Sequence, residues 1–78
     1  MKVEQFLWDY LDNIKKLEMT KEQFKNYNYL DSHMDSFEII QFIMAIEMQF
    51  SITLLPEDIE SEEIRTIGGL ISIIERKL

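Results

Sequence analysis

The dipeptide Asp-Ser occurs twice in quick succession, as Asp31-Ser32 and Asp35-Ser36, with the only histidine, His33, between the two copies. A serine hydroxyl can attack a substrate or accept a covalent group. A hydrolase would also need a base held against that serine. The chain has no Gly-x-Ser-x-Gly elbow, and His33 lies three residues before Ser36 in a predicted loop. We therefore predict no catalytic residue, and we expect His33 to be a solvated loop side chain.

The two serines differ in the residues that come after them. Ser36 begins a long apolar stretch, whose pattern predicts a helix from 36 to about 51. At a helix N-terminus, the free N–H groups and the positive end of the helix dipole favour a phosphate on the Ser36 oxygen, and Asp35 could help to place a metal ion during phosphoryl transfer. The plainer alternative is that Ser36 only caps the helix. Ser32 has no predicted helix after it and lacks this setting.

The predicted helix 36–51 has two apolar faces. At about 100° per residue, one face groups the residues that we expect to be buried: Ile39, Phe42, Ile43, Ile46 and Phe50. A second row contains Phe37, Ile40, Met44 and Met48, and the polar residues Glu38, Gln41 and Glu47 flank it. A few short helices cannot easily surround both faces, so the second row predicts an exposed partner-binding surface. The alternative, that this row is further core, stays open.

The other elements are also predicted to be helical. Apolar residues at helical spacing predict a helix over 2–17: Val3, Phe6, Leu7, Tyr10, Ile14 and Leu17. The sequence TKEQ at 20–23 predicts a capping box and a short helix through Phe24, and Pro56 precedes another short helix before Thr66. Thr66 can cap a last helix over 67–77, whose first turn is weakened by Gly68 and Gly69. The residues of that helix expected to point inward are Ile67, Leu70, Ile71, Ile74 and Leu78.

These elements predict an all-α fold, a small four-helix bundle with a long loop between helices one and two. The chain has 78 residues and no cysteine, so we expect a single domain over 1–78, with neither a disulfide nor a metal site. The net charge is −7, and no Lys or Arg lies between Asn26 and Ile64, which argues against nucleic-acid binding and favours basic partners. We find no signal peptide or membrane span, and we expect a cytoplasmic monomer.

The stretch DSFEIIQFIMAIEMQFSI resembles the acyl carrier protein family. Asp35, Ser36 and Phe37 match the family's Asp-Ser-Leu motif, with Phe in place of Leu, and MAIEMQF at 44–50 matches the end of the helix after the motif. PEDIESEEIRTIGGL at 56–70 resembles the third helix and the start of the fourth. The resemblance covers about residues 30–78, whereas the residues before it agree only in helix placement.

The resemblance implies a carrier and not an enzyme. In the family, a phosphopantetheinyl transferase attaches 4'-phosphopantetheine from coenzyme A to the motif serine, here Ser36 beside Asp35. The thiol of this arm then carries an acyl or aminoacyl group as a thioester. The implied partners are an acyl- or aminoacyl-activating ligase and acyltransferase or synthase enzymes. The alternative is a non-carrier interaction module that uses the apolar row of helix 36–51.

The chain departs from the family pattern at several positions. His33 and Met34 stand before the motif, where the family usually has a Gly two residues before the Asp. Gln41 and Met48 stand where carriers of fatty-acid synthesis are commonly acidic. The stretch DSFEIIQF resembles specialised carriers more closely, such as D-alanyl carriers or those of polysaccharide and secondary-metabolite clusters, so we expect a specialised biosynthetic pathway.

Overall fold

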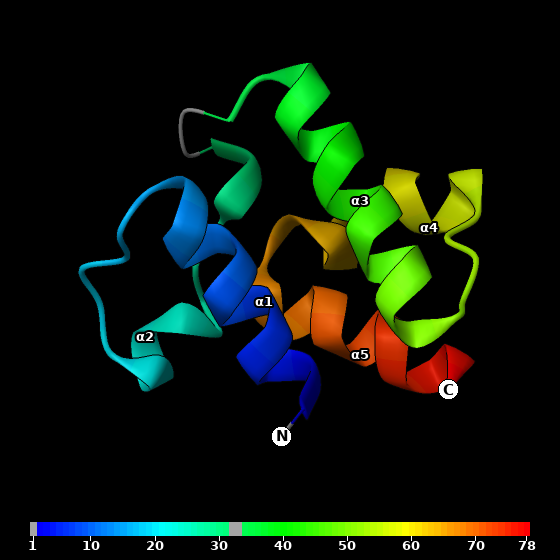
Figure 1. Cartoon of the computed structure of the whole chain (residues 1–78). Coiled ribbons are helices and arrows are strands. Elements are labelled where there is room, and N and C mark those ends of the chain that lie inside the picture. Colours follow the sequence, from blue (N-terminus) through cyan, green and yellow to red (C-terminus); the bar gives the residue numbers. More distant parts are fainter. Residues whose placement is uncertain (1, 32–33) are drawn as a thin grey trace.

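The computed structural model describes residues 2–31 and 34–78, and every regular element within these ranges is helical (Figure 1). The α-helices are α1 (Lys2–Ile14), α2 (Lys21–Phe24), α3 (Ser36–Phe50), α4 (Pro56–Glu60) and α5 (Ile67–Lys77). Two 3₁₀ turns, η1 (Tyr29–Asp31) and η2 (Glu62–Arg65), precede α3 and α5. The predicted all-α bundle is confirmed. None of the helices in the described ranges is long and apolar enough to cross a membrane.

The first helix is shorter than the predicted range 2–17, because α1 ends at Ile14. Beyond this end, the backbone N–H of Leu17 donates to Oδ1 of Asp12 at 2.8 Å, instead of bonding to a carbonyl one turn back. The chain therefore leaves the helix axis and leads into α2. There the predicted capping box is present, since Gln23 N–H donates to Thr20 Oγ1 and Thr20 N–H donates to Gln23 Oε1, both at 3.1 Å.

The long connection between α1 and α3 is tied to the core at two points. Phe24 of α2 is fully buried, and its ring meets Trp8 of α1 edge-on at a centroid distance of 5.0 Å. Tyr29 in the unpredicted turn η1 is 1% exposed and packs edge-on against Phe42 of α3 at 5.4 Å. Removal from water raises the pKa of the Tyr29 phenol well above its usual range. The connection is thus an ordered part of the bundle where the structure describes it.

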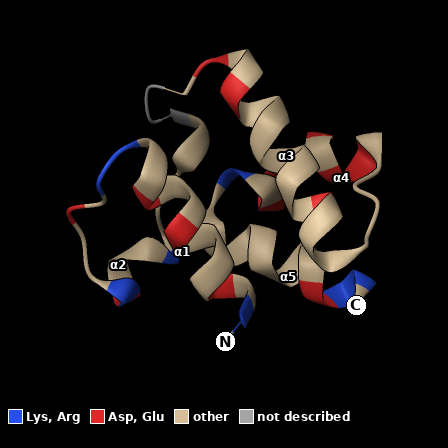
Figure 2. Ribbon diagram, viewed as in Figure 1, with Lys and Arg blue, Asp and Glu red and all other residues tan. Residues whose placement is uncertain are grey.

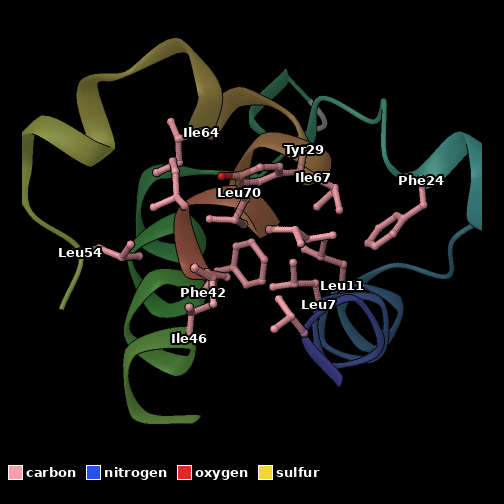
Figure 3. Packing of buried hydrophobic residues seen from close by; sticks show 14 residues of the cluster. Leu7, Leu11, Phe24, Tyr29, Phe42, Ile46, Leu54, Ile64, Ile67 and Leu70 are labelled. Carbon is pink, nitrogen blue, oxygen red and sulfur yellow. The ribbon is translucent and has the colours of Figure 1, made fainter. Parts of the chain in front are cut away.

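Helix α5 forms the centre of the core, with α1 and α3 packed around it (Figure 3). Four of its five predicted inward residues are buried: Ile67, Leu70, Ile71 and Ile74. The fifth prediction, Leu78, was wrong, because Leu78 is 68% exposed. Ile73 is buried in its place. Leu78 comes directly after the last residue of α5 and lies on the same side as Ile71. Ile71 is the least buried of the five buried residues of α5, so the core lies mainly on the side of Ile73.

The apolar stripes of α1 and α3 are not buried along their whole length. On α1, Ile14 is 42% exposed, whereas Leu11 belongs to the core. On α3, Phe42 and Ile46 are fully buried, but the other three predicted core residues are only half-buried: Ile39, Ile43 and Phe50. The ring of Phe50 meets that of Phe6 edge-on at 5.4 Å. α3 therefore touches the core along a narrower stripe than the sequence predicted.

The glycine pair at the start of α5 is explained by close backbone contacts. The Gly68 N–H donates to the Lys25 carbonyl oxygen at 2.8 Å, which ties α5 to the end of α2. At Gly69, a Cβ atom would collide with the backbone carbonyl oxygen of Glu63 in η2. Glycine inside a helix costs about 0.5–1 kcal/mol relative to alanine, and here the tight packing of η2 on α5 offsets that cost.

Candidate functional site

The start of α3 is fixed by a capping box that Asp35 and Glu38 form. Oδ1 of Asp35 accepts the backbone N–H of Glu38 at 2.8 Å, and Oε1 of Glu38 accepts the backbone N–H of Asp35 at 3.2 Å. The Asp35 backbone is extended, as N-cap residues usually are. The helix consequently begins at one defined residue, Ser36.

This arrangement leaves the Ser36 side chain free. Ser36 is exposed at the first helical position, and among the described residues its hydroxyl makes no hydrogen bond. The alternative in which Ser36 caps the helix is wrong, because Asp35 does so. Ser32 and His33, the other candidates of the sequence, lie outside the described residues.

The backbone around Ser36 offers hydrogen-bond donors to an anion. Asp35 takes the N–H of Glu38 with its side chain, and its carbonyl oxygen accepts the N–H of Ile39 at 3.1 Å. Within the described ranges, the N–H groups of Ser36 and Phe37 keep no such partner. Free N–H groups at the positive end of a helix dipole favour negative charge, worth typically about 0.3–1 kcal/mol when exposed. The Ser36 hydroxyl thus lies beside a helix N-terminus that favours the binding of an anion.

The second apolar row of α3 lies on the surface. Exposed fractions are 67% for Phe37, 54% for both Ile40 and Met44, and 82% for Met48. We call these four residues the α3 ridge. Its predicted exposure is confirmed, and the alternative that it is further core is wrong. Its role in binding partners stays a prediction.

The polar residues beside the ridge differ in exposure and in hydrogen bonding. Gln41 is exposed and makes no side-chain hydrogen bond among the described residues. Glu38 and Glu47 are half-buried, and each holds backbone: Glu38 through the capping box, Glu47 by accepting the Leu54 N–H at Oε2 at 2.8 Å. Figure 2 shows these acids as red patches on an otherwise largely tan α3. Glu38 and Glu47 therefore hold the backbone at the two ends of α3 in addition to giving the helix negative charge.

A pocket that the sequence did not reveal opens beside this site. Its volume is about 430 Å³, and it lies between the end of α1, the loop after it, and the residues around the start of α3. Leu11, Leu17 and Tyr27 line its apolar part, and Lys15 and Lys16 contribute charge. The only sequence signal was the Lys-Lys pair at the end of a predicted helix. In the part of the chain that the structure describes, no group of three acidic, His or Cys side chains could hold a metal ion.

Comparison with known proteins supports the resemblance that the motif indicated. The chain is 38% identical over 48 residues to a protein named acyl carrier protein from an Exiguobacterium species, and 35% identical over 48 residues to the acyl carrier protein of Exiguobacterium sibiricum. Each match covers 62% of this chain and 58% of the relative, so the chain spans less than two thirds of these relatives. No family model matches, and no solved structure matches significantly.

Proposed function

We propose that this chain, which is similar over 48 residues to two acyl carrier proteins, belongs to that family and is a carrier whose Ser36 bears a covalent 4'-phosphopantetheine arm. The observation that supports this most is that two neighbouring residues at the start of α3, Asp35 and Ser36, have different roles. Asp35 caps the helix and leaves the exposed Ser36 hydroxyl unbonded among the described residues. A serine needed only for capping would not be placed beside an aspartate that already does this.

The residues at Ser36 fit the group. The N–H groups of Ser36 and Phe37 and the helix dipole would stabilise the phosphate of the arm. Oδ1 of Asp35 is already used by the Glu38 N–H, so its second oxygen, Oδ2, is the one left to contact a metal ion during attachment. Because Ser36 is exposed, a phosphopantetheinyl transferase could reach its hydroxyl.

Attachment consists of one phosphoryl-transfer step. The Ser36 oxygen forms a bond to the phosphorus next to the pantetheine part of coenzyme A. The bond between the two phosphates of the pyrophosphate breaks, and adenosine bisphosphate leaves. The hydroxyl proton passes to a base on the phosphopantetheinyl transferase, because the described part of this chain places no base against Ser36.

When bound, the arm supplies a thiol that carries an acyl or aminoacyl group as a thioester. The protein's contribution is to hold one end of a flexible tether, which keeps the cargo at high effective concentration near a docked enzyme. We propose that the chain itself is not an enzyme, and that it is a cytoplasmic monomer comprising a single domain over 1–78.

The α3 ridge is the proposed docking surface for the transferase, the activating ligase and the acyltransferase or synthase. Its apolar centre would supply affinity, while Glu38 and Glu47 would meet basic residues of the partner and set the approach. Gln41 and Met48 thin the acidic charge of this surface. For that reason we propose partners of a specialised biosynthetic pathway.

The attachment is tested by intact mass after incubation with a broad-specificity transferase and coenzyme A. We expect the mass to rise by one phosphopantetheine for the wild type and for Ser32→Ala, and not for Ser36→Ala. Helical content should be the same in all three proteins. Modification of Ser36→Ala but not of Ser32→Ala would assign the site to the other serine.

The α3 ridge favours a second candidate, a non-carrier interaction module. In that case the ridge binds a partner helix or a second copy of the chain, and Ser36 has no chemical role. The same mass measurement separates the two functions. A folded wild-type protein that stays unmodified, while a known carrier in the same reaction is modified, favours the module.

A further inference from the structure

The pocket beside Ser36 combines an apolar interior with a charged rim that carries two lysines and two glutamates. Leu11 at the end of α1 and Tyr27 before η1 contribute apolar surface, and Lys15 and Lys16 follow directly after α1. Its volume of about 430 Å³ lies within the range of small-molecule sites. Met34 and Glu38, each two residues from Ser36, also line it. A flexible arm that starts at Ser36 therefore begins next to this pocket.

We propose that the pocket receives a short acyl cargo whose far end carries a second carboxylate. This inference rests on the proposed attachment of the arm to Ser36, and it specifies the class of cargo. The methylene chain would lie against the apolar interior, and the terminal carboxylate would meet the ammonium groups of Lys15 and Lys16. The cargo is thus an acyl group derived from a dicarboxylic acid.

The two lysines are available for such a ligand. Both are exposed, and the two ion pairs found among the described residues, Lys77 with Asp58 and Arg76 with Glu63, involve neither of them. The sequence has no Lys or Arg between Asn26 and Ile64, so α3 supplies no positive charge of its own. Figure 2 shows the basic stretch after α1 on the same side of the molecule as the acidic start of α3.

The rim of the pocket also carries two carboxylates, Glu18 and Glu38, which could bind a positively charged cargo. Glu38 already uses Oε1 to hold the Asp35 N–H, and Glu18 lies exposed on the loop after the lysines. An aminoacyl cargo would have to draw its ammonium contacts from these two groups. Glu18, like the two lysines, takes part in no ion pair of the described residues, whereas Glu38 is held by its hydrogen bond to Asp35. A carboxylate cargo thus finds two unengaged lysines and an ammonium cargo only one unengaged glutamate, which is why we propose the acid end.

The pocket is separate from the α3 ridge. None of the ridge residues lines the pocket. Cargo held there would therefore leave the ridge exposed, and a partner could dock while the thioester is still sheltered. The proposed docking surface and the proposed cargo site can be altered independently.

The test compares two cargoes of equal chain length on the intact protein. A broad-specificity transferase loads Ser36 from glutaryl-coenzyme A or from pentanoyl-coenzyme A, and intact mass confirms each loading. Backbone amide chemical shifts are then compared with those of the protein bearing the unacylated arm. We expect the glutaryl group to shift the amides of Leu17 and Tyr27 more than the pentanoyl group does.

Matched variants separate the local lysines from general charge. Lys15→Gln with Lys16→Gln should abolish the difference between the two cargoes. Lys2→Gln with Lys25→Gln removes the same total charge at exposed positions outside the pocket and should preserve the difference. All four lysines are exposed, so both double variants should keep the wild-type fold.

Three outcomes would overturn the proposal. Equal shifts for both cargoes would mean that the lysines do not read the carboxylate, and no shift for either would mean that the pocket stays empty. Lysine-dependent shifts already present with the unacylated arm would assign the lysines to the arm's own phosphate. Failure of loading, seen by mass, would instead refute the attachment at Ser36 and not the role of the pocket.

Discussion

Helices α3 and α5 are both rich in large apolar residues, yet they use them differently. Helix α5 buries five of its residues in eleven, and its exposed positions are polar, such as Ser72 and Glu75. Helix α3 buries only Phe42 and Ile46 among fifteen residues and leaves the α3 ridge in water. Packing alone accounts for the sequence of α5. For α3, packing accounts for only one stripe of apolar residues, and the exposed α3 ridge needs a further reason, which we propose to be partner binding.

The largest expected effect is the loss of a core residue in α5. Leu70→Ala removes a fully buried side chain and should lower the free energy of unfolding by about 2–5 kcal/mol. For a domain of this size, each kcal/mol corresponds to about 4–8 °C in Tm. Urea and thermal denaturation measure the loss. Ile40→Ala, on the exposed side of α3, is the control; equal losses for both would remove the contrast between the helices.

A smaller effect is expected from the cap of α3. Asp35→Ala removes the acceptor of the Glu38 N–H and should cost about 0.5–2 kcal/mol. Ser36→Ala touches no hydrogen bond of the described structure and should stay within about 0.5 kcal/mol of wild type. Chemical denaturation of both variants tests this division. A larger loss for Ser36→Ala would return the capping role to the serine.

The ion pair that joins α4 to α5 should depend on pH. Lys77 Nζ lies 2.8 Å from Oδ2 of Asp58, and their side chains are 22% and 19% exposed. The hydrogen bond from Lys77, followed by that from the Leu55 N–H, lowers the pKa of Asp58. Since the folded pKa lies below the unfolded one, the stabilisation is present above the unfolded pKa of about 4 and is lost as the pH falls through the folded value.

Asp58→Asn should therefore lower the urea midpoint at pH 7, and the difference from wild type should shrink at pH 3. The comparison pair is Arg76 with Glu63, whose side chains are 60% and 49% exposed. Glu63→Gln should change the midpoint less at either pH, because water screens an exposed pair. A pH-independent effect of Asp58→Asn would show that the contact acts through hydrogen bonding alone.

The smallest effect on stability is expected at the ridge. Met44→Ala should change the free energy of unfolding by less than about 0.5 kcal/mol, because the side chain is 54% exposed. It should nevertheless weaken binding to the transferase at any salt concentration, which titration calorimetry measures. A Tm loss as large as that of Leu70→Ala, with binding intact, would contradict the docking proposal.

The periodicity of the sequence predicted where helices form, because apolar spacing and capping residues are local signals. It predicted the Thr20 and Thr66 caps and the boundary of α3 within one residue. The degree of burial was harder to predict, since it depends on which neighbours cover each face. Phe50 and Leu78 both lie on apolar stripes, but the neighbouring elements cover Phe50 only in part and leave Leu78 exposed.

The candidate site was also predictable only in part. The Asp-Ser step before an apolar helix identified Ser36 as the residue of interest. The sequence could not decide between Asp35 and Ser36 as the cap, because both residue types favour that position. The pocket was hidden, since it joins Lys16 and Tyr27 to Met34 across two turns of the chain that no periodic pattern links.

The packing of η2 on α5 has a consequence for mutational surveys. Any side chain at Gly69 would collide with the backbone of Glu63, and backbone cannot swing aside as a flexible side chain can. In a selection for the proposed carrier activity, Gly69 should tolerate almost no replacement and would score like a site residue. A substitution profile taken alone would then mark two unrelated positions, Ser36 for the proposed attachment of the arm and Gly69 because no side chain fits there. Measuring the abundance of each folded variant alongside its activity would tell them apart.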